Sequence, residues 1–262
     1  MNKDSSDTLV AIKHGDDSSG LDTLFDYNAN DVENKSTIEV VGSGNIRNAL
    51  KEYEEMRRLN SHERDYLRSK SVLTSSEINV LIQFISKYDC PEEFAYSNGG
   101  FISDIIQNSY DVGENNFYFN LEGIPSIYSL CSNLTGKDER PIDITVKGNT
   151  SFLFAESSKY LNMFVDGYCA KAFAHAAKNC TLVVKGFVHE LFAAPSRYLT
   201  AIIDGNVDVN AFARNSVNFD GYISHDVSNL EIESTAKILQ GKNAREHPEY
   251  KRMMKEWERR FK

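Results

Sequence analysis

The sequence contains few of the features that would assign a chemistry to the protein. Its 262 residues include only four cysteines, six histidines, five prolines and one tryptophan. The cysteines form no C-x-x-C pair, and the histidines show no H-x-H, H-x-x-x-H or H-E-x-x-H spacing. Neither a zinc site nor a metalloprotease helix is therefore indicated, and we expect no metal and no cofactor. No apolar run reaches the roughly 18 residues that a membrane-spanning helix needs.

Other absences bound the compartment and the activity. The first residues are polar and acidic with no apolar segment behind them, so we expect no secretory signal and a cytoplasmic protein. Cys90, Cys131, Cys169 and Cys180 are then expected as buried free thiols. The formal charge of −9 argues against nonspecific nucleic-acid binding. Because a G-x-S-x-G elbow and a G-x-x-x-x-G-K phosphate loop are also missing, no catalytic residue is assigned.

What the sequence does contain is a repeat. A phrase of apolar residues, one charge and a glycine returns every 19 residues, at Gly148, Gly167, Gly186 and Gly205. The residues four and two places before each glycine are apolar, as expected of strands that are buried on one face. Repeats of about 20 residues indicate a solenoid, and this length suits one turn of a parallel β-helix. An antiparallel sandwich with strands at similar spacing is the alternative.

The residues before the glycines follow the same repeat. Lys147, Asp166, Lys185 and Asp204 alternate in sign. If the turns stack in register, these side chains form a column of opposite charges about 4.8 Å apart, in which like neighbours would be destabilising. A second column, of an aromatic residue followed by alanine, is expected to fill the core. Its members are Phe154-Ala155, Phe173-Ala174, Phe192-Ala193 and Phe212-Ala213.

The repeat can be extended by one unit on each side. Glu122 and Gly123 are assigned to the charge column and the glycine column, and Gly221 continues the glycine column. The predicted domain is a single-stranded, right-handed parallel β-helix of about five to six turns over residues 116–234. The fold class is therefore mostly β with flanking helices.

Residues 118–221 resemble a known family. The run from Gly205 to Gly221, in which Ala211 to Ser216 read AFARNS, and the phrase that ends in glycine every 19 residues carry the resemblance. They are similar to the glycine-repeat (GXGXG) β-helix found in glutamate synthase large subunits and in one of the subunits of formylmethanofuran dehydrogenase. Family members usually carry further glycines within each turn, where this chain has Ala, Ser and Asn. The resemblance implies a non-catalytic structural and packing domain, so no catalytic residue is carried over.

The region before the repeat is expected to hold an acidic arm and then helices. Residues 1–36 contain eight acids and three lysines, which is typical of a flexible arm. Within 37–115, apolar spacing predicts a helix at about 45–59. A capping box formed by Thr74 and Glu77 predicts the start of a second helix.

A third helix is predicted after Asn98-Gly99-Gly100 and should end near Gly113. The expected role of these helices is to cap the N-terminal end of the solenoid, because an uncapped end exposes unpaired backbone and an apolar core.

The last segment, 235–262, is basic. Residues 241–262 hold eight Lys and Arg against four Glu, which leaves −13 for the remainder of the chain. An amphipathic helix is predicted from Pro248, with Tyr250, Met253 or Met254, Trp257 and Phe261 on its apolar face. It could pack on the solenoid, bind a partner or lie on a membrane surface. As a partner-binding surface it would use Tyr250, Met254, Trp257, Phe261, Arg252 and Arg259.

These features favour a non-enzymatic binding or assembly module that contacts a protein partner or a second copy of itself. One alternative is an enzyme with a site on the solenoid flank or at the helix junction. The most acidic cluster available to it comprises Asp204, Asp208, Asp220, His225 and Asp226. Another alternative is an acidic inhibitor that mimics nucleic acid and occupies a basic partner.

Overall fold

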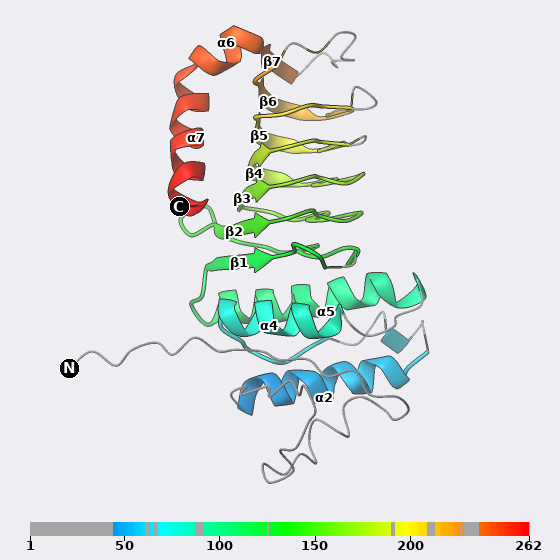
Figure 1. Ribbon diagram of the computed structural model, residues 1–262. Coiled ribbons are helices and arrows are strands. Elements are labelled where there is room, and N and C mark those ends of the chain that lie inside the picture. The colour runs from blue at the N-terminus through cyan, green and yellow to red at the C-terminus, as the bar shows by residue number, and fades with distance from the viewer. Residues whose placement is uncertain are drawn as a thin grey trace, which may run out of the picture.

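The computed structural model describes residues 44–60, 63–64, 68–86, 92–124, 126–189, 192–208, 213–225, 227 and 236–261. Seven parallel strands form one sheet in which each strand pairs with the next along the chain, and Figure 1 shows them stacked as a β-solenoid. The strands are β1 (Asn116–Asn120), β2 (Ile142–Lys147), β3 (Leu161–Asp166), β4 (Lys178–Lys185), β5 (Arg197–Ile203), β6 (Val217–Ile223) and β7 (Ala236–Gln240). The predicted fold class is confirmed, with about four turns of about 19 residues rather than five to six.

The central glycines stack as predicted. An added Cβ on Gly186 would collide with the carbonyl oxygen of Gly167, and one on Gly205 would collide with the carbonyl oxygen of Gly186. Gly186 also has a φ of +150°, a conformation that L side chains rarely adopt. The column is therefore glycine because successive turns approach each other through their backbones.

The register changes at the first turn. Asn116 pairs with Asp143, 27 positions on, and Asn120 pairs with Lys147. Leu121 therefore follows at the level of Gly148, and the assignment of Gly123 to the glycine column is wrong. The longer interval accommodates a hairpin whose strands meet between Lys137 and Arg140.

The register also changes at the last turns. Phe219 lies 20 positions after its partner Leu199, and Ala236 lies 17 positions after Phe219. Gly221 consequently pairs with Ala201 inside the sheet, so its assignment to the glycine column is wrong. An added Cβ on Gly221 would meet the Phe219 ring at 2.9 Å, and the glycine therefore makes room for the core. The predicted strand around Leu230 and Ile232 lies outside the described residues.

Aromatic rings fill the core along the solenoid axis. The rings of Phe154 and Phe173 stack at 5.6 Å between centroids, and those of Phe173 and Phe192 at 5.5 Å. All three are completely buried. The aromatic column is thus present over these turns, whereas Phe212 lies outside the described residues. Cys131, Cys169 and Cys180 are buried free thiols as predicted, and Cys90 lies outside the described residues.

The turns that follow the aromatic positions use left-handed backbone. Ala172, Ala174 and Ala176 have φ values of 60°, 53° and 57°. A left-handed conformation costs a non-glycine residue roughly 1–2 kcal/mol. Backbone hydrogen bonds between turns hold it in place, such as that from the Ala174 amide to the Phe154 carbonyl at 2.8 Å. These turns adopt, with alanine, a conformation that glycine adopts more readily.

Helices cover the β1 end of the solenoid, as predicted: α2 (Gly44–Arg58), α4 (Ser75–Ile85) and α5 (Glu92–Asp111). Side chains on one face of α4 bind the free edge of β1. The Ser75 hydroxyl accepts from the Tyr118 amide at 2.9 Å, and the Asn79 side chain accepts from the Asn120 amide at 3.0 Å. The Gln83 amide donates to the Asn120 carbonyl at 2.8 Å. Helix α4 therefore replaces the missing neighbouring strand.

Two details of these helices bear on the predictions. The capping box of Thr74 and Glu77 is formed at the start of α4. Helix α5 begins at Glu92 and contains Gly99 rather than starting after it. An added Cβ on Gly99 would collide with the carbonyl oxygen of Tyr128, so this glycine permits the helix to approach the first turn closely instead of marking a break.

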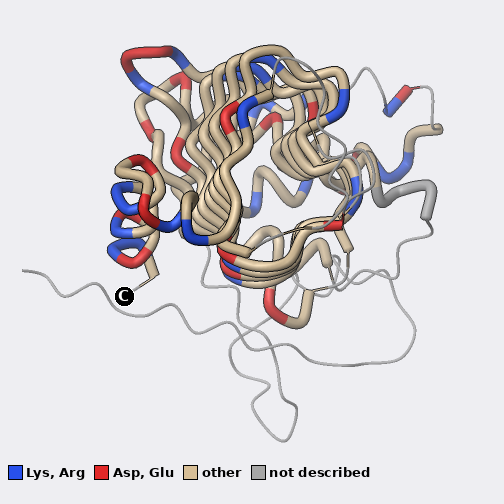
Figure 2. The backbone as a smooth tube through the Cα atoms, turned by 90° about the horizontal axis from the view of Figure 1, so that it is seen from above, with Lys and Arg blue, Asp and Glu red and all other residues tan. Residues whose placement is uncertain are grey.

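Two helices follow the sheet: α6 (Gly241–Glu246) and α7 (Pro248–Phe261). Helix α7 runs back along the outer face of the sheet, so that the C-terminal end lies beside the early strands (Figure 1). Seen along the solenoid axis in Figure 2, the strands superimpose and α7 lies outside them. Across the described ranges, no helix has the length and apolar character to cross a membrane.

Candidate functional site

Helix α7 buries its apolar face against the sheet. Outward-facing side chains of β3, β4 and β5 are apolar where the helix crosses them, although outer faces of such sheets ordinarily carry polar residues. The resulting cluster is Phe164, Val183, Ile202, Tyr250, Met253 and Trp257. Each of these six side chains is at most 7% exposed. Among the three roles that the sequence left open for this helix, the structure places it on the solenoid.

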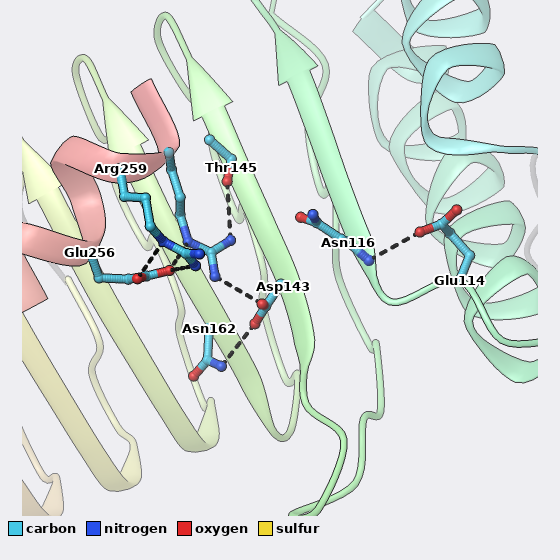
Figure 3. Close-up of polar contacts among 8 residues, drawn as sticks. Glu114, Asn116, Asp143, Thr145, Asn162, Glu256 and Arg259 are labelled. Atoms are coloured by element: carbon cyan, nitrogen blue, oxygen red, sulfur yellow. Dashed lines mark hydrogen bonds and ion pairs between the residues drawn. The ribbon is translucent and has the colours of Figure 1, made fainter. Parts of the chain in front are cut away.

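Polar contacts fix the two ends of α7. The Arg260 guanidinium binds the Asp143 carboxylate at 2.8 Å and lies 4.1 Å from the centroid of the Phe164 ring. In Figure 3, Asp143 lies between Asn162 and helix α7. The Asn162 amide donates to Asp143 at 2.8 Å, which orients the carboxylate toward the helix. Near the other end, the Tyr250 hydroxyl donates to Asp204 at 3.1 Å.

The six residues predicted to bind a partner therefore divide into two groups. Tyr250 and Trp257 are buried against the sheet, and Met254 and Phe261 are half-buried beside it, so none of these is presented to solvent as an anchor. Met253, not Met254, occupies the central apolar position. Only Arg252 and Arg259 lie on the open side of the helix.

Both exposed arginines have acidic partners on their own helix. Arg252 binds Glu249 and Arg259 binds Glu256, each one turn earlier. The hydrogen bond from Arg259 holds the pKa of Glu256 below its ordinary value, and the bond from Arg252 does the same for Glu249. The open side of α7 therefore carries largely neutralised charge, which is the usual state of a solvated helix face.

The alternating charge column is present and is used inside the fold. Lys147 pairs in register with Asp166, and Asp166 with Lys185. At one end Lys147 also binds Glu122 at 3.0 Å, a contact that raises the pKa of Lys147. Lys185 lies 4.4 Å from the Trp257 ring centroid, and Asp204 accepts the Tyr250 hydroxyl. Strand stacking and α7 account for every member of this column.

A second column of charge has a single sign. Lys159 pairs in register with Lys178, and Lys178 pairs with Arg197. All three side chains are exposed. Within the described parts of the chain, no ion pair or side-chain hydrogen bond involves them. We call Lys159, Lys178 and Arg197 the cationic row.

The cationic row is short and has an apolar end. Its register partner on one side is Thr135, and on the other side it is Val217, which is 40% exposed. Tyr198 follows Arg197 in the chain and is 56% exposed. The row therefore stands at the starting ends of β4 and β5, next to two apolar side chains that are open to solvent.

The sequence carried a signal for the cationic row. Lys159, Lys178 and Arg197 each lie eight positions before a glycine of the column, at the same 19-residue interval. The interpretation of the repeat concentrated on the strand residues directly before the glycines and did not compare the positions that precede each strand.

The acidic cluster of the enzyme alternative is not assembled. Asp204 is bound to Tyr250, and Asp220 pairs in register with Thr200 and Lys237. Asp208 lies 3.8 Å from His189. Asp226 lies outside the described residues. The members of the cluster thus have separate structural partners.

The histidines show no catalytic arrangement either. His175 is 3.6 Å from Glu156, and His189 packs edge-on against the rings of Tyr168 and Phe187 as well as facing Asp208. Among the described residues, no group of three His, Cys, Asp or Glu side chains could hold a metal ion. Both histidines make the contacts expected of structural side chains at solenoid corners.

The fold and the charged columns define a helix-capped β-solenoid with one like-charged row on its flank. Comparison with family models, with curated proteins and with solved structures finds no match to this chain.

Proposed function

We propose that the chain is a non-enzymatic protein-binding module in which the solenoid presents the cationic row to a partner. The cationic row is the observation that carries this proposal. Like charges directly opposite on neighbouring strands destabilise a sheet, by up to about 1 kcal/mol per pair. Three in succession, without an acidic partner, are a cost that folding does not require, and residues that oppose stability in this way are typical of functional surfaces.

Two further features support the proposal. The solenoid holds the row on stacked strand backbones, so a partner would meet fixed charges rather than mobile ones. The resemblance to the glycine-repeat β-helix points to the same class, since that domain is a non-catalytic packing element in its family.

Site-specific photocrosslinking tests the proposal. A photoreactive phenylalanine at Val217, beside the cationic row, should crosslink the full chain to a partner in cells that express it. The same residue at Phe187, an aromatic position with similar exposure away from the row, is the matched control. Crosslinking should disappear when Lys178→Glu is added to the Val217 probe.

Equal crosslinking from both positions, or crosslinking that survives Lys178→Glu, would exclude the cationic row as the binding surface. A crosslink to a second copy of this chain would assign the row to self-association, which is the assembly form of the same function.

A further inference from the structure

We infer that the cationic row binds a short acidic polypeptide segment in extended conformation, with an apolar residue next to its acidic ones. This inference rests on the proposed function and specifies the chemistry of the partner. The segment lies along the solenoid axis, because that is the direction in which Lys159, Lys178 and Arg197 succeed one another.

The length of the row limits the ligand. Neighbouring strands lie about 4.8 Å apart, so three stacked positions span about 10 Å. In an extended peptide, side chains on one face recur about every 6.6–6.8 Å. Two or three carboxylates on alternate residues therefore match the row from Lys159 to Arg197.

A long polyanion matches the row less well. Single-stranded nucleic acid is held by positive grooves that track several nucleotides, and anionic membranes attract clusters of four or more basic residues. Here the positive charge stops at Thr135 on one side and at Val217 on the other. The chain as a whole carries −9, which repels any anion that extends beyond the row.

The apolar end of the row favours a polypeptide over a phosphate polymer. Val217 is the register partner of Arg197, and Tyr198 is the next residue after Arg197. Both belong to the small group of large apolar side chains that the described surface exposes. A peptide supplies acids over the cations and an apolar side chain over Val217, so the two kinds of contact also fix its direction.

Fluorescence anisotropy with the full chain tests this inference. The probe is a labelled synthetic peptide of consecutive glutamates followed by Leu-Phe. We expect it to bind, with affinity that falls as salt is raised. Lys178→Glu should weaken binding by about tenfold or more, because it reverses the central charge. Tyr198→Ser should weaken it by about threefold on the same scale, as the loss of one exposed apolar contact.

Matched controls separate the contributions. Lys242→Glu makes the same charge change on helix α6, where Lys242 pairs with Glu246, and should leave peptide binding unchanged. Lys178→Gln removes the charge without reversing it and should give an intermediate loss. A peptide with glutamine in place of glutamate should not bind, and one with serine in place of Leu-Phe should bind more weakly.

Charge exchange gives the sharpest test. The double variant Lys178→Glu, Arg197→Glu should bind a lysine peptide that ends in Leu-Phe and that the natural chain does not bind. Stronger binding of a single-stranded oligonucleotide or of phosphatidylserine vesicles than of the acidic peptide would overturn the inference. So would the absence of acidic-peptide binding by the folded chain.

The two proposals fail separately. If crosslinking at Val217 depends on Lys178 but the acidic peptide does not bind, the protein-binding function stands and only the assigned chemistry is wrong. If the peptide binds at the row but crosslinking is independent of Lys178, the reverse holds, and the row binds acidic peptides without being the surface used in cells.

Discussion

Two columns of charge run along the same stacked strands, and they follow opposite rules. Lys147, Asp166 and Lys185 alternate in sign and are joined to one another by register. The cationic row repeats one sign in the same kind of register and has no described partner. Because strand spacing is the same in both, the difference does not come from the fold. It separates charge that holds the molecule together from charge that is available to another molecule.

The largest effect is expected from removing the stacking on which both columns depend. Gly186→Ala places a methyl group against the Gly167 carbonyl at a positive φ. We expect the free energy of unfolding to fall by roughly 3 kcal/mol or more, as for other severe backbone conflicts. Urea denaturation measures it. Gly100→Ala in helix α5, where the added Cβ meets nothing within 4 Å, is the control and should be neutral or slightly stabilising.

Charge reversal within the alternating column should be the next largest effect. Asp166→Lys places like charges opposite both Lys147 and Lys185. The expected destabilisation is roughly 1–2 kcal/mol, from about 0.5–1 kcal/mol at each neighbour. Thermal unfolding measures it, and Asp166→Asn should lose about half as much because it removes attraction without adding repulsion. An unchanged melting temperature for Asp166→Lys would contradict electrostatic coupling along this column.

The same kind of reversal in the cationic row should have the opposite sign. Lys178→Glu places an acid between Lys159 and Arg197, so we expect the free energy of unfolding to rise by about 0.5–1 kcal/mol. Denaturation at low and high salt measures it, and the gain should shrink in high salt. A loss of stability would show that Lys178 has a structural role, and the contrast between the two columns would then disappear.

The smallest and most local effect concerns the contact between α7 and the alternating column. Burial, together with the Asp204 carboxylate, raises the pKa of Tyr250 to about 12. A raised folded-state pKa means that Tyr250 stabilises docking fully below its unfolded pKa of about 10. This contribution is lost as the pH rises through 12. Trp257 fluorescence should report a local change in this interval, and Tyr250→Phe should remove the part that depends on this hydroxyl.

The sequence predicted the central register because the interval there is constant. It failed at Gly123 and Gly221 because the intervals change to 27, 20 and 17 residues, and alternating apolar residues fit more than one register. Hydrophobic patterning shows which face of a strand is buried, but the length of the intervening turns decides which residues become neighbours. The Glu122–Lys147 ion pair forms even so, since a side chain bridges what the backbone offset separates.

The position of α7 illustrates a different limit. The spacing of Tyr250 and Trp257 identified the apolar face of the helix, but an amphipathic pattern does not name the surface that covers it. The complementary information lay in Phe164, Val183 and Ile202, outward positions of the strands that are apolar where a solvated face would be polar. Considered together, the two patterns predict each other.

The hydrogen bonds from α4 to β1 also limit how the protein could polymerise. Ser75, Asn79 and Gln83 already occupy the backbone groups that a strand from another chain would need. Indefinite head-to-tail fibres require every copy to offer two sticky ends. With one end sealed by its own helix, this solenoid has no route to a fibre built by adding strands to that end, so the helical lid also acts as a chain terminator against amyloid-like growth.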